Sequence, residues 1–405
     1  MRWHHITCTG AIIVLMMVIP TPIFAAPPEF DPDCAVPVPA TPSLIMELGP
    51  PPDSLTRAHR FATGAGVRVA VIDTGISPHP RLPPPVAGGD LVVPRERRPE
   101  APPLPDGALD DCDGHGTIVA GVLSAQPSPE DGVLGVAPGI ELLSIRQTSR
   151  SRAAESPGSG GNLLTLTSAL NLAIDQGARI INVSLTSCLH PALADKVDTR
   201  DFDSVLNRAE ELGVVVVAAA GNVSAQCPPG STVLPAHRPT VVSVAALDTP
   251  HNISGYSVEG PGPLLSASGR IPVAVSPQGT GLAAGLTDGT GVRAFEGTSF
   301  AAPVVSGTAA LLMELHPTDS AAGIRARLAS AVDPATGAVN PDKVVTHLAA
   351  DYRGTPHPVT ITAPDPPSTA LHRRTITTFI SLLCFIGPAF IIMHSRRQRR
   401  SRNGQ

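Results

Sequence analysis

The sequence has no excess of basic side chains and no phosphate-binding loop, and these two absences argue against broad classes of function. It contains 29 Lys and Arg against 34 Asp and Glu, a formal net charge of −5. Arg2 and the seven arginines from Arg373 onward lie in ends that contain no acid, which leaves 21 basic and 34 acidic side chains for the rest. Such a chain does not suggest nucleic-acid binding. The glycine-rich stretch 279–285 misses the G-x-G-x-x-G spacing, so a flexible loop is favoured over a nucleotide site.

The apolar run near the N-terminus is short for a membrane-spanning helix. It extends from Ala11 to Ile19, whereas a span needs about 20 apolar residues. Arg2 precedes the run, and the small residues Ala25 and Ala26 follow it. The pattern predicts a secretory signal peptide over residues 1–26, with an uncleaved anchor as the alternative.

A second apolar run lies near the other end and is long enough to span a membrane. It extends from Ile376 to Met393 and is followed by five arginines between Arg396 and Arg402. We therefore predict a transmembrane helix over residues 375–394 and a basic cytoplasmic tail over 395–405, with the rest of the mature chain outside the cytoplasm. The alternative, a buried core helix, does not account for the arginine cluster.

Composition divides the remaining sequence into three parts. Residues 27–52 are rich in proline and predict either an extended arm lying on the domain or a flexible leader. Residues 350–372 are also proline-rich and predict a stalk. Between them, residues 53–349 alternate short β-branched runs with small-residue helical stretches. This alternation predicts an α/β domain with a mainly parallel sheet covered by helices.

The clearest elements are strands that are apolar throughout, as expected where both faces of a sheet are covered. They are predicted at Val67–Ile72, Ala178–Leu185, Val214–Ala220 and Thr240–Ala246, and the clearest helices at Leu163–Gln176 and Gly297–Leu315. Two segments interrupt the pattern, one dense in proline (78–106) and one dense in glycine and serine (255–291). Connections of this length tend to be functional or disordered.

Four cysteines remain once Cys8 in the signal and Cys384 in the predicted span are set aside: Cys34, Cys112, Cys188 and Cys227. An even number in an oxidising compartment indicates two disulfides, and four cysteines permit three pairings. Cys188 and Cys227 each follow a core strand at the same edge of a parallel sheet, so their loops are expected to be neighbours. The predicted pairs are therefore Cys188 with Cys227 and Cys34 with Cys112.

Three short segments carry candidate catalytic residues, and each has a simpler structural explanation when taken alone. Asp73 ends a buried strand in V-A-V-I-D-T-G, where an Asp is often a turn former or helix cap. His115 lies in D-G-H-G-T between glycines that also mark backbone demands. Ser299 lies in G-T-S-F-A-A-P at the start of a helix, where a serine is often a cap. Together, in this order, they favour a catalytic site.

The three segments resemble the catalytic signatures of the subtilisin family, in its order of Asp, His and Ser. A fourth segment, A-A-A-G-N ending at Asn222, matches the place where that family has its oxyanion-hole asparagine. The resemblance implies a subtilisin-like three-layer α/β fold and acyl transfer. Ser299 would attack the peptide carbonyl, His115 would accept and return the proton, and Asp73 would orient His115. Asn222 and the Ser299 amide would hold the oxyanion.

The same resemblance implies where a substrate binds. Ser184, Leu185 and Thr186 follow I-I-N-V and match the strand against which the family's substrates pair, with Ala220 and Gly221 also next to the substrate. The family's usual Gly-Gly after Ser-Leu is here Thr186-Ser187. This departure implies that the substrate pockets differ in shape from those of the family.

The whole arrangement resembles the mycosins, subtilisin-like proteases tied to type VII secretion. It combines a signal peptide, a cysteine-bearing arm, a protease core, a stalk, one span and a basic tail; local matches include H-P-R-L at 79–82 and A-V-N-P at 338–341. The resemblance implies a peptide or protein substrate and the membrane complex of a secretion system as partner. We expect no cofactor and no metal site. A scaffold role in that complex with little proteolysis is the alternative. A nucleotide-binding domain is disfavoured by export.

Overall fold

The computed structural model describes residues 34–92, 106–150, 160–262, 264–287 and 291–348. The chain divides into two units, Met1–Ala349 and Ala350–Gln405, and all described residues belong to the first. The predicted signal peptide, stalk, membrane helix and tail lie outside the described residues and stay predictions.

The helices are α1 (Pro42–Leu48), α2 (Asp53–Ala58), α3 (His115–Ser124), α5 (Leu163–Asp175), α6 (Arg200–Glu211), α7 (Thr298–Leu315), α8 (Ala321–Ala331) and α9 (Pro341–Thr346), with short 3-10 helices at Gly107–Leu109 and Ala194–Lys196. The strands are β1 (Val36–Pro39), β2 (Arg68–Asp73), β3 (Val86–Asp90), β4 (Glu141–Arg146), β5 (Ile180–Val183), β6 (Ser187–Leu189), β7 (Val215–Ala219), β8 (Thr232–Leu234), β9 (Val241–Thr249), β10 (Asn252–Ile253), β11 (Leu265–Ser268), β12 (Arg270–Ile271), β13 (Ala274–Val275), β14 (Leu282–Thr287), β15 (Val292–Arg293) and β16 (Phe295–Glu296).

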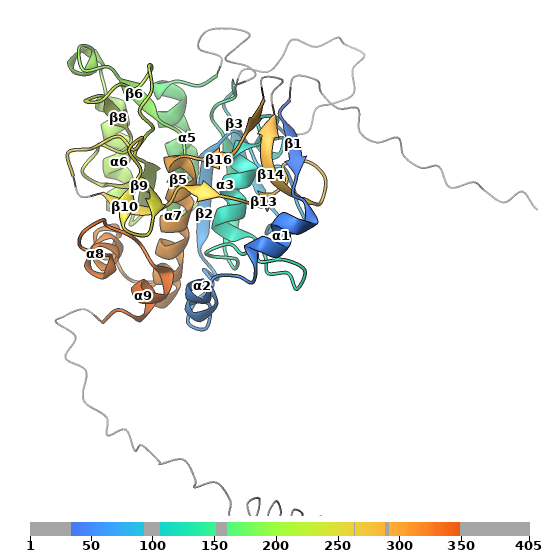
Figure 1. The fold of residues 1–405 in the computed structure, drawn as a ribbon. Helices are drawn as coiled ribbons and strands as arrows, with labels where there is room; N and C mark the ends of the chain where they lie inside the picture. The colour runs from blue at the N-terminus through green and yellow to red at the C-terminus, as the bar shows by residue number, and fades with distance from the viewer. Residues whose placement is uncertain (1–33, 93–105, 151–159, 263, 288–290, 349–405) are drawn as a thin grey trace, which may run out of the picture. The chain divides into compact units, whose positions relative to one another are not determined.

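A central sheet of eight strands organises the domain (Figure 1). Its strands β2, β5, β9 and β10 are labelled in Figure 1. The strand order is β10-β9-β7-β5-β2-β4-β3, with β11 also paired to β9. All of these pairs are parallel except β10 with β9. The parallel strands therefore have their carboxyl ends at one edge, where functional groups gather in open α/β sheets.

The sheet lies between two helical layers, which confirms the predicted three-layer fold. In β2, Val69 and Val71 belong to the core cluster formed with α3 and α7, whereas Ala70 and Ile72 belong to the cluster formed with α5 and α6. All four side chains are at most 1% exposed. Burial on both faces is why the strands are apolar throughout and do not alternate with polar residues.

The four predicted strands and two predicted helices are all present, with ends that differ by a few residues. The helix α5 begins at Leu163, as predicted, because the Asn162 side chain accepts from the Thr165 amide in a capping box. The helix stops before Gly177, which has φ of 76°. The segment 255–291 contains β11 to β14 within its described residues.

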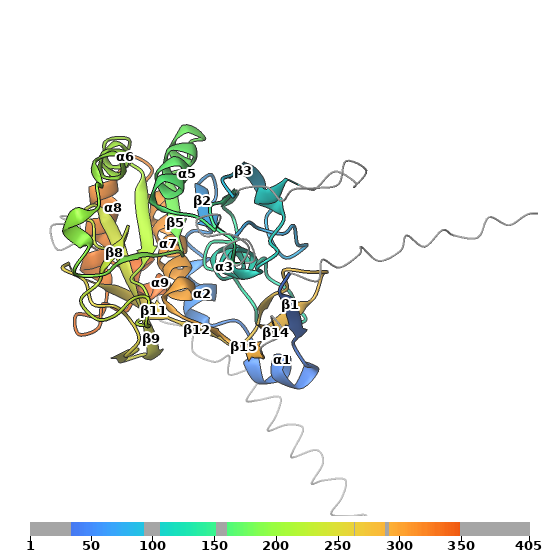
Figure 2. The same ribbon diagram turned by 90° about the horizontal axis from the view of Figure 1, so that it is seen from above.

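The N-terminal arm is attached to the domain from Cys34 onward. β1 pairs with β14, and this antiparallel sheet also contains β13 and β15. Figure 2 shows β1, α1 and β14 together, on the side away from α6. The structure contains the predicted disulfides, Cys34–Cys112 and Cys188–Cys227. The first fixes the arm to the loop that leads into His115.

Within the described ranges, α7 is the one helix long and apolar enough to cross a membrane. Of the residues in α7, 78% are buried, because the helix packs against β5, β7, β9 and β11. It is therefore the core helix of the domain.

Candidate active site

Asp73 and His115 are brought together by the end of one strand and the start of one helix. Asp73 ends β2 and is fully buried, and His115 is the first residue of α3. The His115 Nδ1 lies 2.7 Å from the Asp73 Oδ1. Because an ionised carboxylate only accepts hydrogen bonds, Nδ1 carries the proton and Nε2 has its lone pair free. This is the tautomer that a general base needs.

A close backbone contact explains the glycine after His115. A Cβ added to Gly116 would lie 2.1 Å from the carbonyl oxygen of Gly75, just beyond β2. Gly116 is therefore required for packing the start of α3 against the end of β2, which sets the approach of His115 to Asp73.

The pKa of His115 is the result of two opposing effects. Burial disfavours the charged imidazolium, but the Asp73 carboxylate favours it through both its charge and its hydrogen bond, and Asp111 adds to this. The pKa of His115 is therefore raised above its ordinary value. A base with a raised pKa holds the transferred proton more strongly.

Asp111 holds the loop that precedes His115, and sequence reasoning did not single it out. It is 3% exposed and accepts from the Thr74 hydroxyl at 2.7 Å, from the Gly114 amide at 2.8 Å, and from both the amide and the hydroxyl of Thr117 at 2.7 Å. Burial raises the pKa of Asp111 to about 6. The available signal was an acidic residue shortly before a histidine that begins a helix.

Ser299 is the second residue of α7, and it lines the same small pocket as His115 and Asn222. The pocket has a volume of about 90 Å³. The centroids of the Phe300 and His115 rings lie 5.3 Å apart. Among the described residues, the Ser299 hydroxyl makes no hydrogen bond to His115. Such bonds are often long before a substrate binds.

The orientation of the Asn222 amide follows from its neighbours. The Thr298 backbone amide and hydroxyl both donate to the Asn222 Oδ1, at 3.0 and 3.1 Å. An N–H cannot accept, so the atom facing Thr298 is the oxygen and the Nδ2 donor faces away from it. The Ser299 amide, in the first turn of α7, has no partner within the helix. Two donors are thus available beside Ser299.

A chain of hydrogen bonds from the domain interior ends at the backbone carbonyl of Ser299. The Ser306 hydroxyl donates to the Asn182 Oδ1 at 2.8 Å, the Asn182 Nδ2 donates to the Ser184 hydroxyl at 2.9 Å, and that hydroxyl donates to the Ser299 carbonyl at 2.7 Å. The side chain of Ser184, predicted to lie beside the substrate, is therefore used inside the fold.

The other predicted substrate-binding residues fall into two groups. Leu185 and Thr186 follow β5 and line a hollow of about 130 Å³. Their backbone groups have no backbone hydrogen bond within the described part of the chain. By contrast, the Ala220 amide donates to the Val244 carbonyl, and Gly221 both donates to the Thr298 hydroxyl and accepts from the Val258 amide. Leu185 and Thr186 are the ones free to pair with a peptide.

Comparison with known proteins gives consistent matches. The model of the subtilase family matches residues 64–351. Mycosin-4 of Mycobacterium tuberculosis is 35% identical over 385 residues, covering 86% of this chain and 82% of that protein. The MycP3 protease of the type VII (ESX-3) secretion system is 34% identical, with a TM-score of 0.63 over 79% of this chain and 90% of the other. A chain of an intact ESX-5 inner membrane complex is 27% identical, with a TM-score of 0.65 over 92% and 100% of the two chains.

Proposed function

We propose, for a chain that belongs to the subtilase family and to the mycosins within it, that Asp73, His115 and Ser299 form the catalytic triad of its serine endopeptidase activity. The Ser299 hydroxyl attacks the peptide carbonyl while the His115 Nε2 takes its proton. The tetrahedral intermediate collapses to an acyl-enzyme, and His115 returns the proton to the leaving amine. Water then attacks the acyl-enzyme while His115 takes its proton. His115 returns that proton to the Ser299 oxygen as the acid product leaves. Asp73 orients the ring and balances its charge.

Two donors stabilise the negative charge of the intermediate in this mechanism. They are the Asn222 Nδ2 and the Ser299 amide. The orientation of Asn222 by Thr298 supports this role, since the amide is already turned before a substrate arrives. Donors held in place in this way need no reorganisation during the reaction.

The observation that carries the proposal is the 2.7 Å contact between His115 and Asp73, together with the shared pocket of His115, Ser299 and Asn222. The test is labelling of the full chain in detergent with a fluorophosphonate, followed by peptide mapping. We expect the label on Ser299, and none in Ser299→Ala. Ser330→Ala is the matched control, because Ser330 is an exposed residue of α8 that does not line the pocket of His115 and Ser299. Equal labelling of Ser299→Ala would show that Ser299 is not the nucleophile.

The substrate of this activity is an extended peptide segment. Leu185 and Thr186 follow β5 and offer backbone groups for pairing. They come directly after Ser184, whose hydroxyl donates to the Ser299 backbone carbonyl. A peptide that pairs there gains main-chain hydrogen bonds whatever its side chains. Specificity then depends on the side chains around this segment, where Thr186 and Ser187 stand in place of the usual Gly-Gly of the family.

A second function, in a membrane complex, is supported by a separate observation. Similar chains belong to an intact ESX-5 inner membrane complex and to its periplasmic assembly. By this likeness the chain is a subunit of a type VII secretion membrane complex, held by the predicted helix 375–394 with its protease domain outside the cytoplasm. We expect Ser299→Ala to abolish cleavage and keep the chain in the complex, because the scaffold role does not use the hydroxyl. Loss of the complex in Ser299→Ala cells would mean that assembly requires catalysis.

A further inference from the structure

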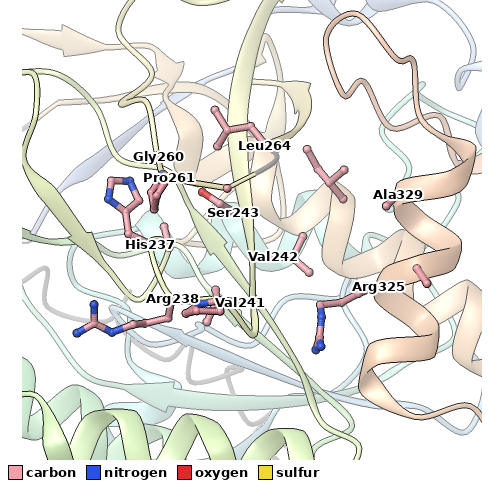
Figure 3. Close-up of a pocket in the computed structure, with 15 residues that line it drawn as sticks. His237, Arg238, Val241, Val242, Ser243, Gly260, Pro261, Leu264, Arg325 and Ala329 are labelled. Carbon is pink, nitrogen blue, oxygen red and sulfur yellow. The ribbon is translucent and has the colours of Figure 1, made fainter.

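Two adjoining hollows form a groove on the domain. The larger has a volume of about 530 Å³, and its lining comes from the segment before β9, from β9 itself, from Gly260 and Pro261, and from α8 (Figure 3). The second, of about 520 Å³, is lined by α6 and by residues just before β9. The two share His237, Arg238 and Pro239. We call them together the α6–α8 groove.

The α6–α8 groove is separate from the candidate active site. It shares no lining residue with the pocket of His115 and Ser299. It also lies at the other edge of the sheet, since Val241 and Leu265 begin β9 and β11, whereas Asp73 ends β2. A substrate held at Ser299 would leave the groove open. An occupant of the groove would likewise leave the pocket of His115 and Ser299 open.

The charged side chains in the groove are already neutralised. Arg325 makes two contacts with Glu210, and Arg238 lies 2.6 Å from Asp203. Burial, together with Arg238, lowers the pKa of His237 and so favours its neutral form. An anion or a cation would find no free counter-charge among these residues, and the lining favours an uncharged, apolar occupant.

Two polar atoms in the wall have no partner among the described residues. One is the hydroxyl of Ser243, which is 8% exposed, and the other is the Nε2 of His237. The Val233 amide donates to the Nδ1 of His237 at 3.1 Å, so Nε2 carries the hydrogen and is a donor. Figure 3 shows the Ser243 oxygen directed to the side where His237, Gly260 and Pro261 lie. Burying a polar group without a hydrogen-bond partner is unfavourable, so a partner supplied from the groove would stabilise both atoms.

Gly260 covers the His237 donor. A Cβ added to Gly260 would lie 3.0 Å from the His237 Nε2. A small displacement of Gly260 would open the donor to an acceptor in the groove. A peptide carbonyl is an acceptor that would recover the missing hydrogen bond.

We infer that the α6–α8 groove binds an extended apolar segment of another protein subunit of the membrane complex. Each hollow has a volume within the ~300–1,000 Å³ range of small-molecule pockets. Two such hollows on either part of the shared segment His237–Pro239 fit an extended segment better than one compact molecule. The exposed Ala326 and Ala329 of α8 let a backbone approach closely. This inference rests on the proposed role in a membrane complex, and it identifies the α6–α8 groove as the surface that contacts another subunit there.

The test compares two neighbouring positions of α8 in full-length chains expressed in cells. Ala329→Trp fills the groove, whereas Ser330→Trp places the same ring on an exposed residue that does not line it. We expect Ala329→Trp to lower recovery of the chain with the solubilised complex by roughly tenfold. We expect Ser330→Trp to have no effect and both variants to keep wild-type peptidase activity. Equal recovery of the two variants would overturn the inference.

A photo-crosslinking measurement identifies the occupant. We expect benzoylphenylalanine at position 326 to crosslink to another subunit of the complex, and the same group at position 330 not to do so. Crosslinking at position 326 only to a second copy of this chain, to lipid, or to nothing would overturn the inference. If the wild-type chain does not co-purify with the complex at all, the proposed complex role fails first. If it does and the groove variants do too, only the groove assignment fails.

Discussion

Replacing the amide of Asn222 separates its contact with Thr298 from its proposed contact with the substrate. Asn222→Asp has the same shape and keeps an oxygen toward the Thr298 amide and hydroxyl, which now lie 3.0 and 3.1 Å from Oδ1. It replaces the Nδ2 donor with a second oxygen. Asn222→Ala removes both contacts. The pair therefore distinguishes a residue that stabilises the helix start from one that donates to an oxyanion.

The expected magnitudes follow from the geometry. Asn222 is exposed and Thr298 is fully buried, so Asn222→Ala costs the fold about 1 kcal/mol through the lost contacts with Thr298. The catalytic loss is larger, because an oxyanion donor contributes about 2.7–4 kcal/mol, or ~100- to 1,000-fold in kcat. Asn222→Asp should lose at least as much activity, since its negative charge opposes the oxyanion, while its stability stays near that of the wild type.

The assay is kcat and KM on a fluorogenic peptide that the wild type cleaves, with unfolding measured in parallel. We expect kcat to fall in both variants and KM to change little, because the donor acts mainly in the transition state. If Asn222→Asp keeps kcat within about threefold of the wild type, Asn222 does not donate to the oxyanion. The residue would then act only through Thr298.

Three further predictions use other features of the site. Because the pKa of His115 is raised, we expect kcat/KM to rise with pH with a midpoint above ~6.5, the ordinary value for histidine. A midpoint at or below that value would contradict the prediction. The folded-state pKa of about 6 for Asp111 lies above its unfolded value, so its contribution to stability falls as pH rises from about 4 through 6. Denaturation of the wild type and Asp111→Asn at several pH values should show the wild type losing stability relative to the variant over that window, and the opposite trend would mean that its four donors outweigh burial. Removing both Cys34 and Cys112, which are 78 residues apart, should lower stability by about 2–5 kcal/mol and weaken protection of β1 from hydrogen exchange, whereas unchanged protection would show that pairing with β14 alone holds the arm.

Local patterns in the sequence were enough to predict the core strands, because those strands are apolar on both faces. The strand predicted at Val214–Ala220 is observed at Val215–Ala219, for example. The Cys188–Cys227 disulfide was predictable because parallel strands place the residues after them at one edge, and the Cys34–Cys112 pair was the one that remained. The candidate residues Asp73, His115 and Ser299 were found from their motifs, and the fold brings Asp73 to His115 and places Ser299 in the same pocket as His115.

Elements held by distant contacts could not be predicted in this way. β4 was missed because Ser144 interrupts its apolar run, yet Ser144 is fully buried and donates to the Ala108 carbonyl. β14 lies in a segment of glycine and small residues, and its longest pairing is with β1, which lies near the N-terminus of the chain. The role of Thr298 in turning Asn222 depends on a contact between residues 76 positions apart.

The hydrogen-bond chain from Ser306 through Asn182 and Ser184 to the Ser299 carbonyl has a consequence for how such an enzyme can change. It fixes the position of Ser299 relative to the middle of the sheet, independently of the surface loops. In the proposed mechanism, substitutions around Thr186 therefore alter which peptides bind without displacing the Ser299 hydroxyl. New specificities are thus open to single mutational steps, while any change to Asn182 risks the chemistry for every substrate at once.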